Sequence, residues 1–516
     1  MSAGSAGRTD TLPGVSRRDF LRIGGGVSVA LGALAATGAT VHGVGAAPVI
    51  AALDAAQARP EASNMELIGF DDLQARSAYQ VLVHHHTTGG SDRWILYVGH
   101  HGGEAPNPMT GQVEQNGTSL VDVTDPTRPV YLSHVPGAPG GSEGGGAQMM
   151  RVVDGKNLTN ADQDKVFMLR TFGNDGHQIY DVTDPAQPSL VTVLQTGLQS
   201  THKNHWDPAT GIAYLVSDGR REGWRTDRMT RIYDLNDPTN PRFIRNFGLI
   251  GQEPGSTEAP IPLGLHGAIP LGNRLYVAYG TSSDGVIQIV DTDKLLNGDP
   301  DASDPFAPTA ENLLYPQIGR LDMSPNWGAH TTFPVLGRNI ADFNTSTKGQ
   351  TRDFLVVTSE ATANECQEFR HLTFMVDITT ESRPFSVATF EVPEASGNFC
   401  SRGGRFGPHA TSESFAPPYY GKIVFVSYFN AGVRAVDIRD PFDPREVGFF
   451  IPAVTDKTDR RCITVDGTDR CKLAIQTNNV EYDERGNVYI VDRANTGMHV
   501  LRLTGQAAAI AAGPAY

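Results

Sequence analysis

The chain has 516 residues, of which 39% are apolar and 8% aromatic, with 56 Gly and 33 Pro. This composition is typical of a globular protein that is rich in turns and poor in helix formers. The formal net charge of -15 argues against nucleic acid or an anionic membrane surface as a partner.

The first segment, residues 1–47, has the pattern of an export signal. The sequence SRRDFL at residues 16–21 precedes a Gly- and Ala-rich apolar run, and small residues follow at 44–47. This pattern resembles a twin-arginine signal peptide and predicts a periplasmic or secreted protein. The apolar run is too short for a permanent span, so we expect no membrane span in the mature chain. The alternative is a chance arginine pair before an apolar segment.

The next residues predict a linker and then a single strand. Residues 48–63 are rich in Ala, and residues 64–70 read NMELIGF. That strand resembles residues 445–450, REVGFF, which follow a repeated phrase further along. An N-terminal copy of the last strand of a blade is one way in which a propeller closes its ring.

One phrase recurs along the rest of the chain. It reads LVDVTDPTRP at residues 120–129, IYDVTDPAQP at 179–188 and IYDLNDPTNP at 232–241. Looser copies begin at residues 289, 375 and 435. Each copy joins a short apolar strand containing one Asp to a turn, usually one built on Asp-Pro. Repetition of this kind indicates a solenoid, a propeller or an array.

Each repeat unit predicts four strands, with the phrase as the third. A strongly apolar second strand begins in turn at Trp94, Val166, Ala213, Leu275, Phe354, Ile423 and Val488. The third strand of the last unit, residues 498–503, lacks the Asp. We therefore predict an all-β fold, a seven-bladed β-propeller of four-stranded blades over residues 64–503, closed by the strand at 64–70, with a C-terminal tail at 504–516. A solenoid or a two-sheet sandwich is the alternative, and the single N-terminal strand argues against both.

The phrase resembles the LVIVD repeat of bacterial propeller proteins. The nearest copies are Ile289-Val-Asp and Ala435-Val-Asp-Ile. The resemblance covers about residues 64–503 and implies the propeller fold. Because that family has no single agreed activity, the resemblance implies no particular chemistry.

The loops divide the predicted propeller into a plain face and an elaborated one. The long loops lie at residues 99–117, 218–230, 251–264, 296–328, 359–371 and 452–474. They share one face, and loops on a rigid scaffold are where functional sites usually lie.

The four cysteines also belong to the elaborated face. An even number of cysteines in an exported protein predicts two disulfides. The short spacing of Cys462 and Cys471 favours the pairs Cys462–Cys471 and Cys366–Cys400 among three possible pairings. A thiolate metal site needs tighter spacing.

Histidines recur at one equivalent position, the start of the innermost strand. They are His202, His266, His330 and His409, and the last blade has Asn478 there. Blade 2 would place Met149 at this position, and blade 1 is ambiguous, with Gln80 through His84 in range. Imidazoles that converge on one axis suit a transition metal such as Cu, Fe or Zn. The alternative is that these histidines cap loop carbonyls or line a wet channel.

Further polar residues are predicted at the rim of the same mouth. They are His101, His177, Arg220, Glu360, Asn478 and Arg493. Such a set suits general acid–base chemistry, and the alternative is a solvated rim with ordinary ion pairs. The Asp of each repeat recurs regardless of blade, so we expect it to be structural.

Three functions fit these features. The first is an exported metal-dependent oxidoreductase. In architecture and supply of histidines the chain resembles the carotenoid-cleaving oxygenases, which hold iron, and the methanethiol oxidases of the selenium-binding protein family, which use copper. The second is a non-catalytic propeller that binds a small molecule or an envelope protein on the long-loop face. The third is a lactonase-like hydrolase, whose Ca²⁺ site would require oxygen ligands that this His-rich ring supplies poorly.

Overall fold

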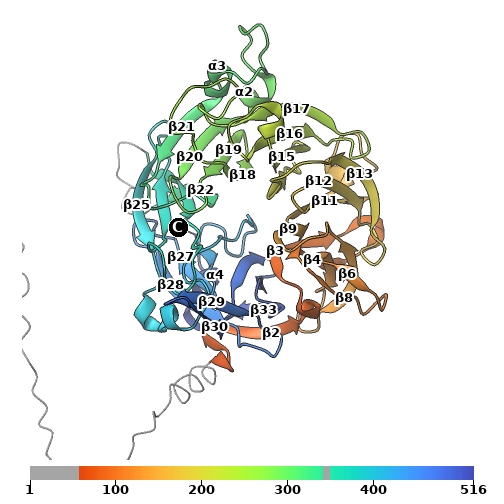
Figure 1. Cartoon of the computed structure of the whole chain (residues 1–516), viewed down its shortest axis with the longest axis vertical. Coiled ribbons are helices and arrows are strands. Elements are labelled where there is room, and N and C mark those ends of the chain that lie inside the picture. The colour runs from red at the N-terminus through yellow and green to blue at the C-terminus, as the bar shows by residue number, and fades with distance from the viewer. Residues whose placement is uncertain (1–56, 341–348, 516) are drawn as a thin grey trace, which may run out of the picture. The chain divides into compact units, whose positions relative to one another are not determined.

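The computed structural model describes residues 57–340 and 349–515, and in Figure 1 their strands stand in blades around a central axis. Residue contacts divide the chain into residues 1–50 and 51–516, and the described residues belong to the second unit. The predicted signal segment and residues 48–56 of the predicted linker lie outside the described residues. None of the described helices is long and apolar enough to cross a membrane.

The first four blades follow the chain in antiparallel order. Blade 1 contains β3 (Ala78–His86), β4 (Arg93–Gly102), β7 (Gly117–Asp122) and β8 (Val130–Pro136), with β9 (Ser142–Ala147) beside β4. Blade 2 contains β10 (Met150–Asp154), β11 (Val166–Phe172), β12 (Gly176–Asp181) and β13 (Ser189–Gln195). Blade 3 contains β14 (Asn204–Trp206), β15 (Ile212–Ser217), β16 (Met229–Asp234) and β17 (Arg242–Phe247). Blade 4 contains β18 (Leu265–Leu271), β19 (Arg274–Tyr279), β20 (Val286–Asp291) and β21 (Gln317–Asp322).

The last three blades complete the ring. Blade 5 contains β22 (Thr331–Asn339), β23 (Thr351–Thr358), β24 (Thr373–Asp377) and β25 (Phe385–Phe390). Blade 6 contains β26 (Ile423–Ser427), β27 (Val433–Asp437), β28 (Arg445–Ile451) and β1 (Glu61–Ser63). Blade 7 contains β31 (Thr477–Tyr482), β32 (Asn487–Asp492), β33 (Met498–Leu503) and β2 (Met65–Asp71). The described residues thus form seven four-stranded blades, and the predicted fold class is confirmed.

The N-terminal strand closes the ring as predicted, and the segment before it also takes part. Strand β2 pairs with β33 from Met65–Leu503 to Asp71–Met498 and forms the outer edge of blade 7. Residues 61–63, expected at the end of a linker, form β1 and pair with β28. In blade 6 the innermost position is reduced to one bridge between Thr411 and Val426.

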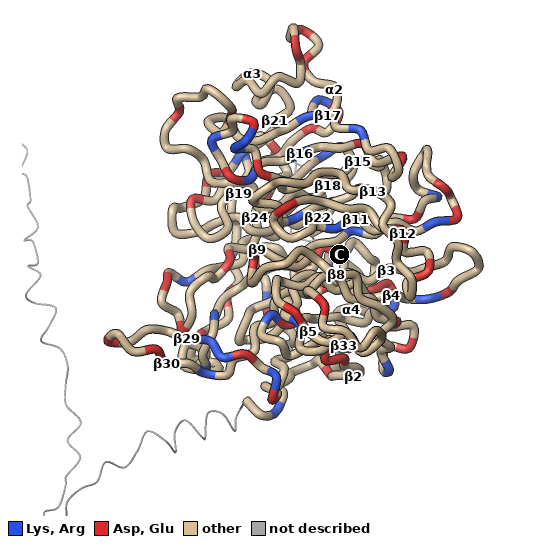
Figure 2. The backbone as a smooth tube through the Cα atoms, turned by 45° about the vertical axis from the view of Figure 1, so that its right-hand side comes forward, with Lys and Arg blue, Asp and Glu red and all other residues tan. Residues whose placement is uncertain are grey.

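Among the described residues, few helices, turns or hairpins lie outside the blades. They are the hairpin β5 (Glu104–Pro106) with β6 (Val113–Gln115), the hairpin β29 (Arg460–Val465) with β30 (Thr468–Leu473), the helices α2 (Thr292–Asn297), α3 (Ala310–Leu314) and α4 (Gly505–Ala512), and short 3-10 turns η2 (Leu73–Ala75), η3 (Thr88–Gly90), η4 (Gly155–Asn157), η5 (Arg220–Glu222), η7 (Glu394–Ser396) and η8 (Phe399–Ser401). Helix α4 lies in the predicted tail and packs Ala507 and Ile510 into the core shared by blades 6 and 7. In Figure 2 the charged residues lie mainly in turns and loops, and β29–β30 projects from the propeller.

Each repeated Asp stabilises the turn that follows its strand. It is the last residue of the third strand in six blades. The carboxylate of Asp181, for example, accepts from the main-chain N of Thr183 at 2.9 Å and from Lys165 Nζ at 2.6 Å. Asp122 and Asp377 accept in the same way from the residue two positions on. An Asp side chain that captures this backbone N–H fixes a tight turn, so the predicted structural role is confirmed.

Two disulfides join the cysteines in the predicted pairs. Cys462 and Cys471 face each other across β29 and β30, with their Cα atoms 4.0 Å apart. Cys366 and Cys400 link two loops, with a Cα separation of 5.3 Å. Such bridges are typical of proteins in an oxidising compartment.

Candidate functional site

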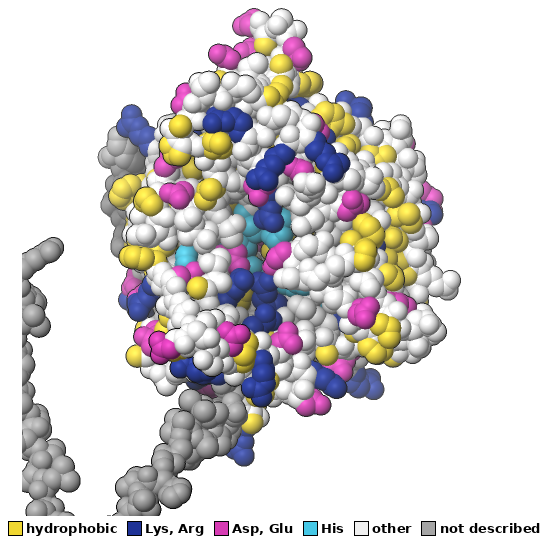
Figure 3. Space-filling view, viewed as in Figure 1, with side chains coloured by type: hydrophobic (Ala, Val, Ile, Leu, Met, Phe, Trp, Pro, Cys, Tyr) yellow, Lys and Arg dark blue, Asp and Glu magenta, His cyan; other side chains and the backbone are white. Residues whose placement is uncertain are grey.

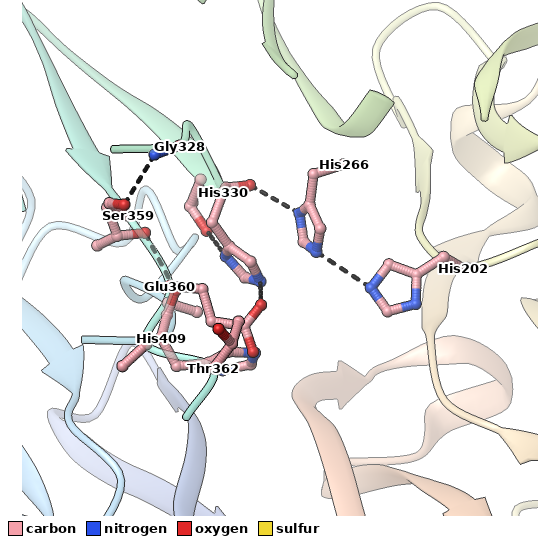
Figure 4. Close-up of polar contacts among 12 residues, drawn as sticks. His202, His266, Gly328, His330, Ser359, Glu360, Thr362 and His409 are labelled. Atoms are coloured by element: carbon pink, nitrogen blue, oxygen red, sulfur yellow. Dashed lines mark hydrogen bonds and ion pairs between the residues drawn. The ribbon is translucent and has the colours of Figure 1, made fainter. Parts of the chain in front are cut away.

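The start of each innermost strand is where side chains meet at the axis. The four predicted histidines come together there, and Figure 4 shows them side by side. Ring centroids lie 4.9 Å apart for His202–His266, 3.6 Å for His266–His330 and 4.5 Å for His330–His409. All four side chains are buried.

Irregular strand pairing contributes to this arrangement. The pairing of β18 with β19 shifts between Leu265 and Gly267, so that His266 is the extra residue of a bulge. Asn478 occupies the equivalent bulge between Thr477 and Asn479 in blade 7. An extra residue bends the strand and re-aims its side chain. Both residues are thereby held at the axis.

In blade 1 the equivalent residue is Tyr79. The shift in the pairing of β3 with β4 spans Ala78 to Val81 and therefore contains Tyr79 and Gln80. The Tyr79 hydroxyl lies 3.0 Å from His202 Nε2. The range expected for blade 1, Gln80 to His84, thus began one residue too late. The residue expected in blade 2, Met149, is fully buried just before β10.

The side chains are held by bonds from one blade to the next. His266 Nδ1 lies 2.7 Å from the main-chain oxygen of His330, and His409 Nδ1 contacts the main-chain oxygen of Asn478. Asn478 Nδ2 donates in turn to the oxygen of Tyr79 at 3.0 Å. Because a carbonyl oxygen only accepts, both imidazoles carry their proton on Nδ1. Their Nε2 lone pairs are left for another partner at the axis.

The environment keeps these imidazoles neutral. Burial lowers the pKa of all four well below the ordinary value. Neighbouring imidazoles lower the pKa of His266 and His330 further, and Arg228 does the same for His202. Burial also raises the pKa of the Tyr79 hydroxyl. Neutral imidazoles are the form in which histidine binds metals.

Glu360 adds a carboxylate to the histidines. It follows β23 by two residues, and its oxygens lie 3.7 Å from His330 Nε2 and 3.8 Å from His409 Nε2. Arg405 Nη1 donates to it at 2.9 Å. The ligand atoms of His330, Glu360 and His409 all lie within 4.8 Å of one another, which is close enough to hold one metal ion. His330 Nε2 is buried without a hydrogen-bond partner in the described structure.

A network behind Glu360 fixes the loop that carries it. The carboxylate of Glu368 accepts from the main-chain N of Thr362 at 2.7 Å and of Ala363 at 2.9 Å. His371 lies 3.3 Å from Glu368 and 2.8 Å from Ser359 Oγ. The Ser359, His371 and Glu368 side chains resemble a nucleophile triad in composition, but Ser359 is fully buried. Their arrangement therefore positions the loop and offers no accessible nucleophile.

A pocket of about 180 Å³ opens above the histidines. Figure 3 shows histidine at the bottom of a hollow bordered by basic and acidic side chains. The lining residues are Tyr79, Glu143, His202, Arg228, His266, Thr281, Glu360, Thr362, Arg405 and Arg493. Three arginines and two carboxylates thus surround a small space next to the imidazoles.

Glu143 reaches this pocket from the glycine-rich strand β9. A Cβ at Gly146, whose φ is +75°, would lie 2.3 Å from the main-chain oxygen of His100, so only glycine lets β9 lie this close to β4. Arg493 Nη2 donates to Glu143 at 2.6 Å, and His101 Nε2 lies 3.3 Å from the same oxygen. Burial raises the pKa of Glu143, but His101 and Arg493 together lower it below its ordinary value.

The remaining predicted rim residues lie elsewhere. His177 is fully buried between blades 2 and 3, where its Nε2 lies 3.3 Å from the main-chain oxygen of Val216. Arg220 is exposed in η5 and does not line the pocket. Asn478 belongs to the ring of inter-blade bonds. Glu360 and Arg493 line the pocket, and His101 contacts Glu143 and Arg493 beside it.

Six residues that line the pocket were not predicted from the sequence: Tyr79, Glu143, Arg228, Thr281, Thr362 and Arg405. Tyr79 stands at the start of an innermost strand, as the histidines do, so its position in the repeat could have identified it. Glu143 lies in a run of glycines, and Arg405 follows Gly403 and Gly404. Nothing in the local sequence distinguishes Arg228 from the other arginines of its loop.

The chain matches no protein-family model and no curated protein sequence. Solved structures similar to it include Raptor from Chaetomium thermophilum, with a TM-score of 0.48, 12% identity, and coverage of 87% of this chain and 30% of that one. Sqt1 from Saccharomyces cerevisiae has a TM-score of 0.45 at 9% identity, covering 85% and 99%. Sqt1 from Chaetomium thermophilum, bound to the N-terminus of ribosomal protein L10, has a TM-score of 0.43 at 12% identity, also covering 85% and 99%. The chain therefore spans less than a third of the Raptor structure that it resembles.

Proposed function

We propose that this chain is an exported β-propeller of the LVIVD-repeat type that holds one transition-metal ion at its axis. The ligands would come from His202, His266, His330 and His409, together with Glu360. On this proposal the protein acts in the periplasm or outside the cell as a metal-dependent oxidoreductase. The two disulfides support export, because such bonds persist in oxidising compartments.

The observation that carries the proposal is the buried and unpartnered Nε2 of His330. A buried polar atom without a partner costs about 1–3 kcal/mol, so such atoms need an explanation. Glu360 lies 3.7 Å away, too far for a hydrogen bond. Two atoms that bind one metal at about 2.1 Å lie about 3–4 Å apart. A cation between them would satisfy both groups.

His202 and His266 would join the ion held by His330, Glu360 and His409, which are the three described residues whose ligand atoms lie within 4.8 Å of one another. His202 Nε2 and His266 Nε2 are 3.0 Å apart, within the range for two ligands of one metal. Main-chain oxygens hold His266 and His409 in the tautomer that presents Nε2, which is how outer contacts usually orient metal-binding imidazoles.

The donor set indicates the class of metal. Imidazole with one carboxylate suits Cu, Fe or Zn, whereas Ca²⁺ prefers oxygen ligands. A bound ion of this class would supply Lewis acidity or, for Cu and Fe, one-electron chemistry. Tyr79 stays protonated beside the site and can donate its hydroxyl proton in a hydrogen bond to a bound ligand.

Elemental analysis of the folded, exported protein tests the proposal. We expect about one transition-metal ion per chain, and its loss from the double variant His266→Ala/His330→Ala. The matched control is His177→Gln, which changes an equally buried histidine outside the pocket and should keep the ion. A metal-free wild type whose stability the double variant leaves unchanged would favour a non-catalytic binding propeller. Calcium alone would favour the hydrolase.

A further inference from the structure

The pocket above the histidines carries an arginine with no visible partner. Arg405 and Arg493 donate to Glu360 and Glu143, respectively. The guanidinium of Arg228 also lines the pocket, but it forms no hydrogen bond or ion pair with any residue that the structure describes. One positive charge at the pocket is therefore left without a counter-charge.

The charge of the lining has the opposite sign to that of the whole chain. Three arginines and two carboxylates line the pocket. The formal charges of these arginines and carboxylates sum to about +1, while the formal net charge of the chain as a whole is -15. The proposed metal ion would raise the positive charge further. A positive pocket on an acidic protein selects for an anion at this one place.

The pocket is small, with a volume of about 180 Å³. A ligand of a few non-hydrogen atoms fills this space. A planar guanidinium donates two parallel N–H bonds to a planar carboxylate, which makes this group a good match for Arg228.

From this charge, size and geometry we infer that the pocket binds a small carboxylate anion, with Arg228 as its main contact. The inference rests on the proposed function in that the metal site lies below the same pocket and would act on this anion. Glu143 repels the anion and occupies Arg493, so it weakens binding. Arg228 is accordingly a specificity residue for anionic over neutral ligands.

Calorimetric titration with sodium acetate tests the inference, with acetamide as the neutral probe of similar shape. We expect acetate to bind the wild type and acetamide not to bind. Arg228→Gln should weaken acetate binding about 10–100-fold, because it removes a charged hydrogen bond. Arg228→Lys keeps the positive charge but lacks the two parallel donors of a guanidinium. Its affinity for acetate should therefore lie between those of the wild type and Arg228→Gln. Glu143→Gln should tighten binding, because it frees Arg493 and removes a negative charge.

Arg220→Gln is the matched control, since Arg220 is an exposed arginine at the start of the same loop. It should bind acetate as the wild type does. Equal acetate affinity in wild type and Arg228→Gln, no acetate binding at all, or equal binding of acetamide would each overturn the inference.

The metal content of every sample separates this inference from the proposed function. Arg228→Gln should keep its metal. If no metal is found but acetate binding depends on Arg228, only the proposed function fails. If the metal is present and acetate binding does not depend on Arg228, only the carboxylate pocket is refuted.

Discussion

His266 and His330 stand at the same position of neighbouring blades, and Nδ1 of the first donates to the main-chain oxygen of the second at 2.7 Å. His409 contacts Asn478 in this way, and Asn478 contacts Tyr79. Each of these side chains is thus oriented by the backbone of the next blade. The axial site and the closure of the ring consequently depend on the same bonds.

Replacing Asn478 should weaken ring closure. Asn478→Ala removes the donor to the Tyr79 oxygen across the junction of blades 7 and 1. Because both groups are buried, the free energy of unfolding should fall by about 1–3 kcal/mol. Denaturant titration measures this loss. Asn297→Ala, which removes a similar bond on an exposed helix, is the control. An equal loss of unfolding free energy in both variants would show that the bond between blades 7 and 1 stabilises the protein no more than a surface bond does.

A bound metal should stabilise the fold. A ligand that binds only the native state at 100 times its Kd adds about 2.7 kcal/mol. Adding the metal to chelator-treated protein should therefore raise the Tm. Glu360→Gln should weaken metal binding at least about tenfold, because it replaces a carboxylate ligand with an amide. The exposed Glu66→Gln should behave as wild type, and a Tm rise that Glu360→Gln leaves intact would remove Glu360 from the ligand set.

His177 should make the protein less stable in acid. Burial lowers the pKa of its imidazole from 6.5 to about 4 in the folded state. Between these values the unfolded chain binds a proton that the folded chain does not, so stability falls as the pH drops below about 6.5. From pH 7 to pH 5 the wild type should lose about 2 kcal/mol more than His177→Gln. Denaturant titrations at the two pH values measure the difference, and equal losses would contradict the assignment.

The repeated Asp should matter as a hydrogen-bond acceptor. Asp181→Ala removes the acceptor for the main-chain N of Thr183 and should cost about 1 kcal/mol of unfolding free energy. Asp181→Asn keeps an acceptor oxygen for the same turn and should cost less. If the two variants lose equal stability, Asp181 stabilises the fold mainly through its ion pair with Lys165 and not through its hydrogen bond to the turn.

The two disulfides should differ in their contribution to stability. Cys366–Cys400 spans 34 residues and Cys462–Cys471 spans 9. The longer loop loses more freedom in the unfolded chain when it is closed, by roughly 1 kcal/mol on the loop-entropy relation. Replacing Cys366 and Cys400 by Ser should therefore lower the Tm more than replacing Cys462 and Cys471. The opposite order would mean that native contacts of the β29–β30 hairpin dominate.

The architecture could be predicted from the sequence because its signals are local. Apolar strands, Asp-Pro turns and the copy of a last strand at residues 64–70 each act over a few residues. The repeat also gave a register, and counting along it placed His202, His266, His330 and His409 at equivalent positions. Blade 1 departed from this register because its first strand contains a two-residue irregularity. A bulge of that kind depends on the partner strand.

Only the tertiary structure decided which charged groups share the pocket. Glu143 comes from strand β9 beside blade 1, and Arg228 and Arg405 come from loops of other blades, so their positions depend on how these segments fold over the mouth. The same holds for His177 and Arg220, which resembled rim residues in sequence but lie between blades and on the surface. The repeated sequence determines the features that all blades have in common, because each blade packs similar apolar strands and turns in the same way. The charged residues of the pocket differ from blade to blade, and only long-range packing brings them together.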